Sequence, residues 1–175
     1  MSEPPLQPPL ILTLAFDADT FAHFDGLRRR HFPENLNFIP AHATLFHHLP
    51  GEAERGVIET IATLARTMPA PEVAVTGLRF IGRGVAYSLE SEALSGFRAK
   101  LARAFDGHLT AQDRQGWRPH VTVQNKVSPE TARALHAALQ HGFTPFRFTA
   151  PATLLWRYLG GPWEARTRFA FGENG

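Results

Sequence analysis

The sequence predicts an α+β fold built from two similar halves, and three observations lead to this prediction. Apolar runs typical of strands alternate with amphipathic stretches typical of helices. The order strand, helix, strand, helix, strand occurs twice. A histidine two residues before a threonine, inside an apolar run, occurs once in each half, at His42 and at His120. We therefore expect a duplicated bilobal fold with two antiparallel-leaning sheets, flanking helices, a pseudo-two-fold axis and a central cleft.

The first lobe is predicted over about residues 10–82. A buried strand opens it, and the helix that follows can be capped by Asp17 or Asp19, whose carboxylates accept hydrogen bonds from free N–H groups of a first turn. The histidine strand ends at Pro50 and Gly51, which are typical of turns. The predicted elements are a strand at 10–16, a helix at 17–32, a strand at 40–49, a helix at 52–68 and a strand at 72–82.

The second lobe is predicted over about residues 84–172. Its last helix has clear boundaries: Ser128 as N-cap, Pro129 in the first turn and Gly142 at the end. The predicted elements are strands at 85–91, 119–127, 143–151, 152–160 and 164–172, and helices at 92–105 and 128–142. We expect a single domain over 1–175, in which the C-terminal strands can cross between the lobes. The alternative is a doubly wound parallel sheet, but no glycine-rich loop follows the first strand.

Composition excludes several classes of function. The 175-residue chain has no cysteine, so disulfides, thiolate metal sites and cysteine nucleophiles are excluded. A net charge of +2 is too small for a protein that coats long nucleic acids. Of the 18 basic residues only Lys100 and Lys126 are lysines, and the planar fork of arginine suits phosphate oxygens. With no basic region before the first apolar run and no membrane-length segment, we expect a cytoplasmic protein without membrane contact. We also expect it to be a monomer.

Residues two apart on a strand share a face, so each histidine strand should present a polar side to the cleft. In the first strand this rule predicts a cleft face made of His42, Thr44, Phe46 and His48, with His47 pointing away. In the second strand it predicts a cleft face made of Arg118, His120, Thr122, Gln124 and Lys126. Two such faces across one cleft predict a shared site, because a polar face must line something wet or be fully hydrogen-bonded.

The segments His42-Ala43-Thr44-Leu45 and His120-Val121-Thr122-Val123 resemble the paired H-x-[ST]-x motifs of the two-histidine (2H) phosphoesterase superfamily. This superfamily includes bacterial 2′-5′ RNA ligases and RNA cyclic phosphodiesterases. The resemblance extends over nearly the whole chain in length and element order, and the stretch 158–164 is similar to the C-terminal strands of the family. The residues that follow each motif indicate no particular subfamily.

The resemblance implies a metal-independent phosphodiesterase without cofactors, acting on 2′,3′-cyclic phosphates of RNA ends or nucleotides, or on 2′-5′ linkages. His42 and His120 would be the catalytic acid–base pair, since imidazole titrates near neutral pH. Thr44 and Thr122 would donate hydrogen bonds to the phosphate oxygens, where negative charge gathers. The implied partner is an RNA end or a small nucleotide.

Further residues are candidates for substrate binding, and two other classes of function stay open. Arg118 and Lys126 can meet a phosphate or a neighbouring nucleotide, and the aromatic candidates for stacking on a base are Phe46, Tyr158 and Trp163. One alternative is a non-catalytic module that binds an RNA end or a nucleotide in the same cleft. The other is a metal site formed by His42, His47, His48 and His120. The expected orientation of His47, and the lack of a carboxylate near either motif, disfavour the metal site.

Overall fold

A computed structural model describes residues 7–172. The first six and last three residues of the predicted domain, which include most of the segment before the first apolar run, lie outside the described residues. The elements, in chain order, are β1 (Leu10–Leu14), α1 (Ala18–His31), η1 (Glu34–Leu36), β2 (Ala43–Leu49), η2 (Gly51–Ala53), α2 (Glu54–Arg66), β3 (Glu72–Phe80), β4 (Val85–Glu90), α3 (Glu92–Ala104), α4 (Ala111–Arg114), β5 (His120–Gln124), α5 (Pro129–His141), β6 (Phe146–Thr149), β7 (Ala152–Tyr158) and β8 (Trp163–Ala170).

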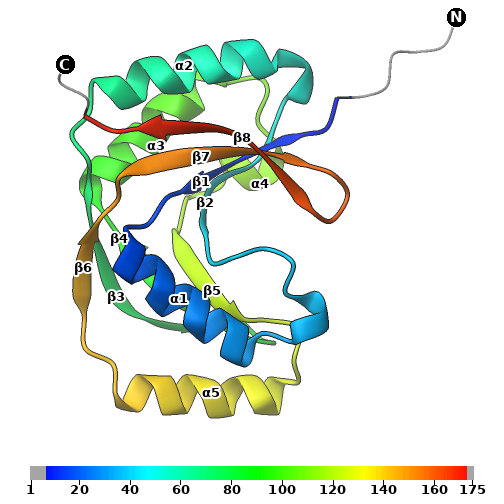
Figure 1. The fold of residues 1–175 in the computed structure, drawn as a ribbon, viewed down its shortest axis with the longest axis vertical. Helices are drawn as coiled ribbons and strands as arrows, with labels where there is room; N and C mark the ends of the chain where they lie inside the picture. Colours follow the sequence, from blue (N-terminus) through cyan, green and yellow to red (C-terminus); the bar gives the residue numbers. More distant parts are fainter. Residues whose placement is uncertain (1–6, 173–175) are drawn as a thin grey trace, which may run out of the picture.

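The strands form two four-stranded sheets, ordered β2-β1-β7-β8 and β5-β4-β3-β6 (Figure 1). Every pairing in both sheets is antiparallel. The predicted α+β class with two antiparallel sheets is therefore confirmed, and the doubly wound parallel sheet is excluded. After β6 the chain crosses from the second sheet to the first, where β7 pairs with β1 and β8 pairs with β7.

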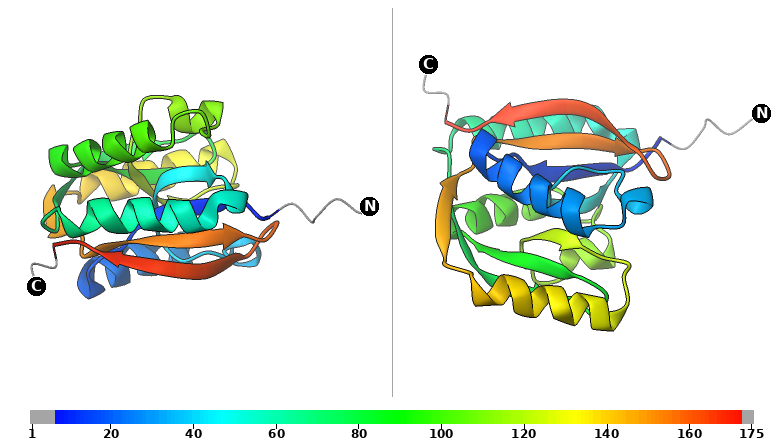
Figure 2. Two further views of the ribbon diagram at one scale, coloured as in Figure 1. Left: turned by 90° about the horizontal axis from the view of Figure 1, so that it is seen from above. Right: turned by 60° about the horizontal axis from the view of Figure 1, so that its bottom comes forward.

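Two of the helices, α1 and α3, contact the sheet opposite to the one whose strands they connect. Helix α2 packs against β8 and α3, and α5 packs against β3 and β4 (Figures 1 and 2). Helix α1 joins two strands of the first sheet but packs against β5 of the second. Helix α3 joins two strands of the second sheet, yet its Phe97 ring contacts Phe171, just after β8 of the first, with ring centroids 5.2 Å apart. None of the helices within 7–172 is long and apolar enough to cross a membrane.

The predicted N-caps Asp17 and Ser128 match the structure, whereas several strands end earlier than predicted, β5 by three residues. Asp17 accepts a hydrogen bond from the Thr20 backbone N–H at 2.8 Å, and Ser128 accepts one from Thr131 at 3.1 Å. Strand β5 ends at Gln124 instead of continuing to residue 127, because Lys126 adopts a left-handed backbone conformation with φ of 63°. Such a residue cannot continue the extended ladder. The short helix α4 and the two 3₁₀ turns were not predicted.

One hydrophobic core joins the two sheets. It contains fully buried residues of both sheets, for example Leu12 and Leu45 in the first and Val73 and Val121 in the second. Strands β2 and β5 belong to different sheets but lie in contact with each other (Figure 1). The fold therefore brings the two histidine-bearing strands together, although their motifs are far apart in the sequence.

Candidate active site

Strand β2 is irregular, and the irregularity decides which of its side chains reach the cleft. Thr44 pairs with Thr13 of β1, but Phe46 already pairs with Leu12, so one extra residue of β2 is inserted between the two pairs. Neighbouring residues of β1 point to opposite faces, so Thr44 and Phe46 do as well. A second extra residue follows before Leu49.

This bulge corrects two of the predicted orientations. Phe46 was expected in the cleft, but its side chain is fully buried, with the Arg98 guanidinium 4.3 Å from its ring centroid. The prediction of Phe46 as a base-stacking residue is therefore wrong. His47 was expected to point away from His42, but both side chains line the same cavity. The rule of alternation fails because it assumes a strand without inserted residues.

A cavity of about 240 Å³ lies where β2 and β5 meet, and it contains both histidine–threonine pairs. Its lining residues are Ile11, His42, Thr44, His47, His120, Thr122 and Trp163. The structure thus brings together the four motif residues, one of the aromatic candidates and a third histidine. Trp163 lies edge-on to His42, with ring centroids 4.9 Å apart.

The two motif histidines are held in the same way. Nδ1 of His42 lies 2.9 Å from the carbonyl oxygen of Pro40, and Nδ1 of His120 lies 2.9 Å from that of Arg118. Each acceptor is two residues before the ring. Because a carbonyl oxygen only accepts hydrogen bonds, Nδ1 carries the proton in both rings. In a neutral ring, Nε2 then keeps its lone pair and is the atom available for proton transfer.

Both rings favour the neutral form in the free protein. Burial lowers the pKa of His42 to about 4; the Pro40 carbonyl opposes this, and the nearby charge of Arg28 adds to it. Burial also lowers the pKa of His120, opposed by the Arg118 carbonyl and reinforced by Arg79. At neutral pH each Nε2 is therefore an acceptor, ready to take a proton.

A buried carboxylate, Asp113 of α4, holds the bulged part of β2. Its oxygens accept hydrogen bonds from the backbone N–H of His47 at 2.9 Å and of His48 at 2.9 Å, and lie 3.1 Å from His47 Nδ1. Burial acts to raise the pKa of Asp113, but the hydrogen bonds from His47 and His48 outweigh it and keep the pKa below its ordinary value. Asp113 thereby fixes both the backbone of β2 and the ring of His47.

Two buried arginines connect each half of the molecule to the histidine strand of the other half. Arg28 of α1 donates a hydrogen bond to the Thr122 carbonyl on β5 at 3.0 Å. Arg98 of α3 donates to the Leu45 carbonyl on β2 at 3.2 Å and to the Asp113 carbonyl at 2.6 Å. Trp117 donates from Nε1 to the Thr44 carbonyl at 2.9 Å. The backbones of both motifs are thus held by distant residues.

Sequence reasoning missed Asp113, Arg28 and Arg98, although the two arginines left a signal. Arg28 lies four residues after the buried Phe24, and Arg98 lies four residues after the buried Leu94. Each arginine is therefore on the buried stripe of its helix, where a charged residue needs a partner. Asp113 left no such signal, because it is 66 residues from His47 in a segment without apolar periodicity.

The remaining candidates lie outside this cavity. Arg118 and Lys126 are exposed, and Tyr158 is 40% exposed at the end of β7. His48 is exposed and contributes its backbone N–H to Asp113. Within residues 7–172, no group of three or more His, Cys, Asp or Glu side chains is arranged to hold a metal ion.

The fold and the paired motifs are those of the two-histidine phosphoesterases, a superfamily of phosphoesterase and ligase-like enzymes. The model of the 2′-5′ RNA ligase superfamily matches residues 16–162, and the chain belongs to this superfamily. The resemblance of the two motifs to this superfamily is thereby confirmed. No curated protein sequence matches the chain.

Solved structures share the fold at low sequence identity. TT0787 of Thermus thermophilus is 16% identical, with a TM-score of 0.66 over 95% of this chain and 100% of that one. E. coli LigT complexed with 3′-AMP is 17% identical, with a TM-score of 0.55 over 95% of this chain and 99% of that one. E. coli LigT complexed with phosphate is 16% identical, with the same TM-score and coverage.

Proposed function

We propose that the protein is a metal-independent phosphodiesterase that opens 2′,3′-cyclic phosphates of RNA ends or nucleotides, or cleaves 2′-5′ linkages, with His42 and His120 as acid and base. The observation that carries the proposal is that both histidine rings and both threonine side chains belong to one cavity of about 240 Å³, with each Nε2 left available. All of these groups come from one chain, so a monomer is sufficient for activity.

The reaction needs two proton transfers on opposite sides of one phosphorus atom. A neutral ring accepts a proton from water through Nε2 while the water oxygen forms a bond to phosphorus. The bond from phosphorus to the departing ribose oxygen breaks, and the second, protonated ring gives that oxygen its proton. The products are a phosphomonoester and a free hydroxyl for a cyclic substrate, and the proton count balances with no metal ion.

Substrate binding prepares the second ring for its role. Burial and neighbouring positive charge lower both pKa values in the free protein, so the neutral form of each ring is favoured at neutral pH. A bound phosphodiester brings a negative charge between the rings, which favours protonation of one of them. Thr44 and Thr122 then donate hydrogen bonds to the non-bridging oxygens, where charge develops in the transition state.

The ligands of relatives agree with this class of substrate. Structures of E. coli LigT contain 3′-AMP, phosphate, ATP or NADP⁺, all of which carry phosphate. A 3′-phosphorylated nucleoside is one product expected when a nucleoside 2′,3′-cyclic phosphate is opened. We therefore propose the same chemical class, a nucleotide with a 2′ or 3′ phosphoester, as substrate here.

The direct test is hydrolysis of a nucleoside 2′,3′-cyclic phosphate by the purified full-length protein in the presence of EDTA. We expect turnover that EDTA does not reduce and that falls by about 10²–10⁴-fold in His42→Ala and in His120→Ala. Binding of the cyclic nucleotide without turnover would instead identify a non-catalytic binding module. Activity that EDTA removes and zinc restores would identify metal chemistry and overturn the proposal.

A further inference from the structure

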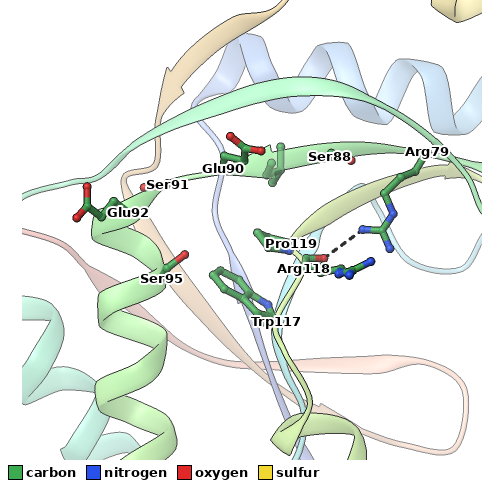
Figure 3. A pocket seen from close by; sticks show the side chains of 10 residues that line it. Arg79, Ser88, Glu90, Ser91, Glu92, Ser95, Trp117, Arg118 and Pro119 are labelled. Carbon is green, nitrogen blue, oxygen red and sulfur yellow. Dashed lines mark hydrogen bonds between the residues drawn. The ribbon is translucent and has the colours of Figure 1, made fainter.

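A second and larger cavity, of about 600 Å³, opens between β3, β4, the start of α3 and the segment 117–119, which directly precedes His120 in the chain (Figure 3). Its principal lining residues are Arg79, Ser88, Glu90, Ser95, Trp117 and Arg118. None of these residues lines the 240 Å³ cavity, so the proposed acid–base chemistry does not account for them.

The larger cavity is joined to the candidate active site through one backbone carbonyl. The carbonyl oxygen of Arg118 lies 2.9 Å from His120 Nδ1 and accepts a hydrogen bond from Arg79 Nη1 at 3.5 Å. In addition, Ser88 on β4 pairs directly with His120 on β5, so the two side chains stand on the same face of the sheet. A ligand held at His120 can therefore extend over Ser88 toward Arg79.

The charges of this cavity are separated. Arg79 and Arg118 lie together at one end, while Glu90 and Glu92 lie at the other (Figure 3). Among the described residues, neither Arg79 nor Arg118 forms an ion pair with a carboxylate. The end with the arginines is thus suited to an anion, and the end with the carboxylates to N–H or O–H donors.

Trp117 supplies a fixed aromatic wall. Its Nε1 donates to the Thr44 carbonyl at 2.9 Å, and the guanidinium of the buried Arg98 lies 6.0 Å from its ring. The indole is therefore held in place before any ligand arrives, while part of it faces the cavity (Figure 3). A rigid aromatic surface beside paired guanidinium groups is the combination that binds single-stranded nucleic acid, through stacking and phosphate contacts.

We propose that this cavity is a subsite for the nucleotide next to the reacting one, so that the preferred substrate is an RNA oligonucleotide end and not a free cyclic mononucleotide. Arg79 and Arg118 bind the adjacent backbone phosphate, Trp117 stacks on its base, and Glu90 and Glu92 accept hydrogen bonds from ribose or base donors. This inference rests on the proposed function, because it requires the reacting phosphate to lie between His42 and His120.

A third cavity, which adjoins the candidate active site at His42 and Trp163, has the opposite character. It measures about 270 Å³ and lies beside His42, with an apolar and aromatic lining that includes Phe16, Phe21, Trp156 and Trp163. This surface offers no guanidinium to a backbone phosphate but can accept a base. The two flanking cavities therefore give the substrate a direction, with the terminal base beside His42 and the rest of the strand beside His120.

The test compares kcat/KM for adenosine 2′,3′-cyclic phosphate with that for a triadenylate ending in a 2′,3′-cyclic phosphate. We expect the full-length protein to prefer the oligonucleotide by about 10-fold or more, as expected from one added stack and one added phosphate contact. Arg79→Met and Arg118→Met should each reduce this ratio toward 1. For the oligonucleotide, the slope of log KM against log salt should also become shallower by about 0.7 per lost phosphate contact. Arg66→Met, on the exposed side of α2, is the matched control and should retain both the ratio and the slope.

The outcomes separate this inference from the proposed function. Hydrolysis of neither substrate by the wild-type protein would remove the proposed function itself. Hydrolysis of both at equal kcat/KM, or a ratio that neither arginine variant changes, would overturn only the subsite. An equal loss for both substrates in Arg79→Met would mean that Arg79 acts through His120, and would also count against the subsite. Because the Arg118 side chain is exposed, Arg118→Met keeps the test decisive if Arg79→Met fails to fold.

Discussion

Strands β2 and β5 carry the same motif, yet the two are supported differently. In both, the histidine ring is held by a carbonyl oxygen two residues earlier. Strand β2 is bulged, brings the extra His47 into the cavity and is held by Asp113, Arg98 and Trp117. The motif backbone of β5 receives one side-chain hydrogen bond from the other half, from Arg28.

The surroundings of the two rings differ as well. His42 lies edge-on to Trp163 beside an apolar cavity, whereas His120 lies beside Arg79 and a polar cavity. An acid–base pair needs two groups in opposite protonation states, so identical surroundings would be a disadvantage. A duplicated motif thus supplies two equal rings, and the residues around the rings make them unequal.

Removal of either ring is expected to have the largest effect. His42→Ala and His120→Ala should each lower kcat by about 10²–10⁴-fold, the usual contribution of a positioned proton-transfer group. The double variant should be little slower than the slower single variant, because the pair acts as a unit. The measurement is steady-state hydrolysis of a cyclic nucleotide, with thermal melting to verify folding and the exposed His108→Ala as control. Additive losses in the double variant would mean that the rings do not act together.

Replacement of Asp113, which holds β2, should lower the stability of the protein far more than replacement of an exposed carboxylate. Asp113→Asn removes the negative charge that accepts hydrogen bonds from His47 and His48. Because hydrogen bonds to charged groups are worth about 1.5–3 kcal/mol each, we expect the free energy of unfolding to fall by about 2–4 kcal/mol. Urea denaturation measures this, with the exposed Asp106→Asn as control.

The same carboxylate also predicts a pH dependence of stability. The folded pKa of Asp113 is below its ordinary value, so its contribution is present above the unfolded pKa and is lost as the pH falls through the folded pKa. In Asp113→Asn this part of the acid destabilisation should be absent. An Asp113→Asn protein as stable as the wild type would mean that β2 keeps its bulge without the carboxylate.

The two threonines should behave alike, which makes them a test of the symmetric part of the site. Thr44→Val and Thr122→Val each remove one hydrogen bond to a charged oxygen, worth about 1.5–3 kcal/mol. This corresponds to a loss of roughly 10- to 150-fold in kcat/KM. A loss confined to one of the two variants would show that only one hydroxyl contacts the phosphate.

The pH profiles should reveal the effect of the bound phosphate on the rings. In the free enzyme both pKa values are below the ordinary 6.5, so the form with one protonated ring is most abundant in acid, and kcat/KM should be highest below pH 6.5. Bound phosphate favours protonation, so the maximum of kcat should lie about one pH unit higher, a difference worth about 1.4 kcal/mol. Coinciding maxima would contradict this effect of substrate on the rings.

Local sequence patterns predicted much of this molecule because the forces involved act over a few residues. Asp17 and Ser128 cap helices through hydrogen bonds to residues three positions later, and such contacts can be inferred without the fold. The strand–helix order and the H-x-T spacing likewise depend on near neighbours. The orientation of Phe46 was predicted wrongly because β2 has an extra residue where it pairs with β1. A rule of strict alternation cannot represent such an inserted residue.

By itself, the sequence determined the α+β class, the duplicated order of elements and the pair of histidine–threonine motifs, because periodicity, capping and spacing are properties of neighbouring residues. Only the tertiary structure decided that His47 enters the cavity, that Phe46 leaves it, and that Asp113 and Arg28 hold the two strands. These outcomes depend on buried charges that must find partners far away in the chain. Their partners are set by how the two sheets pack around one core.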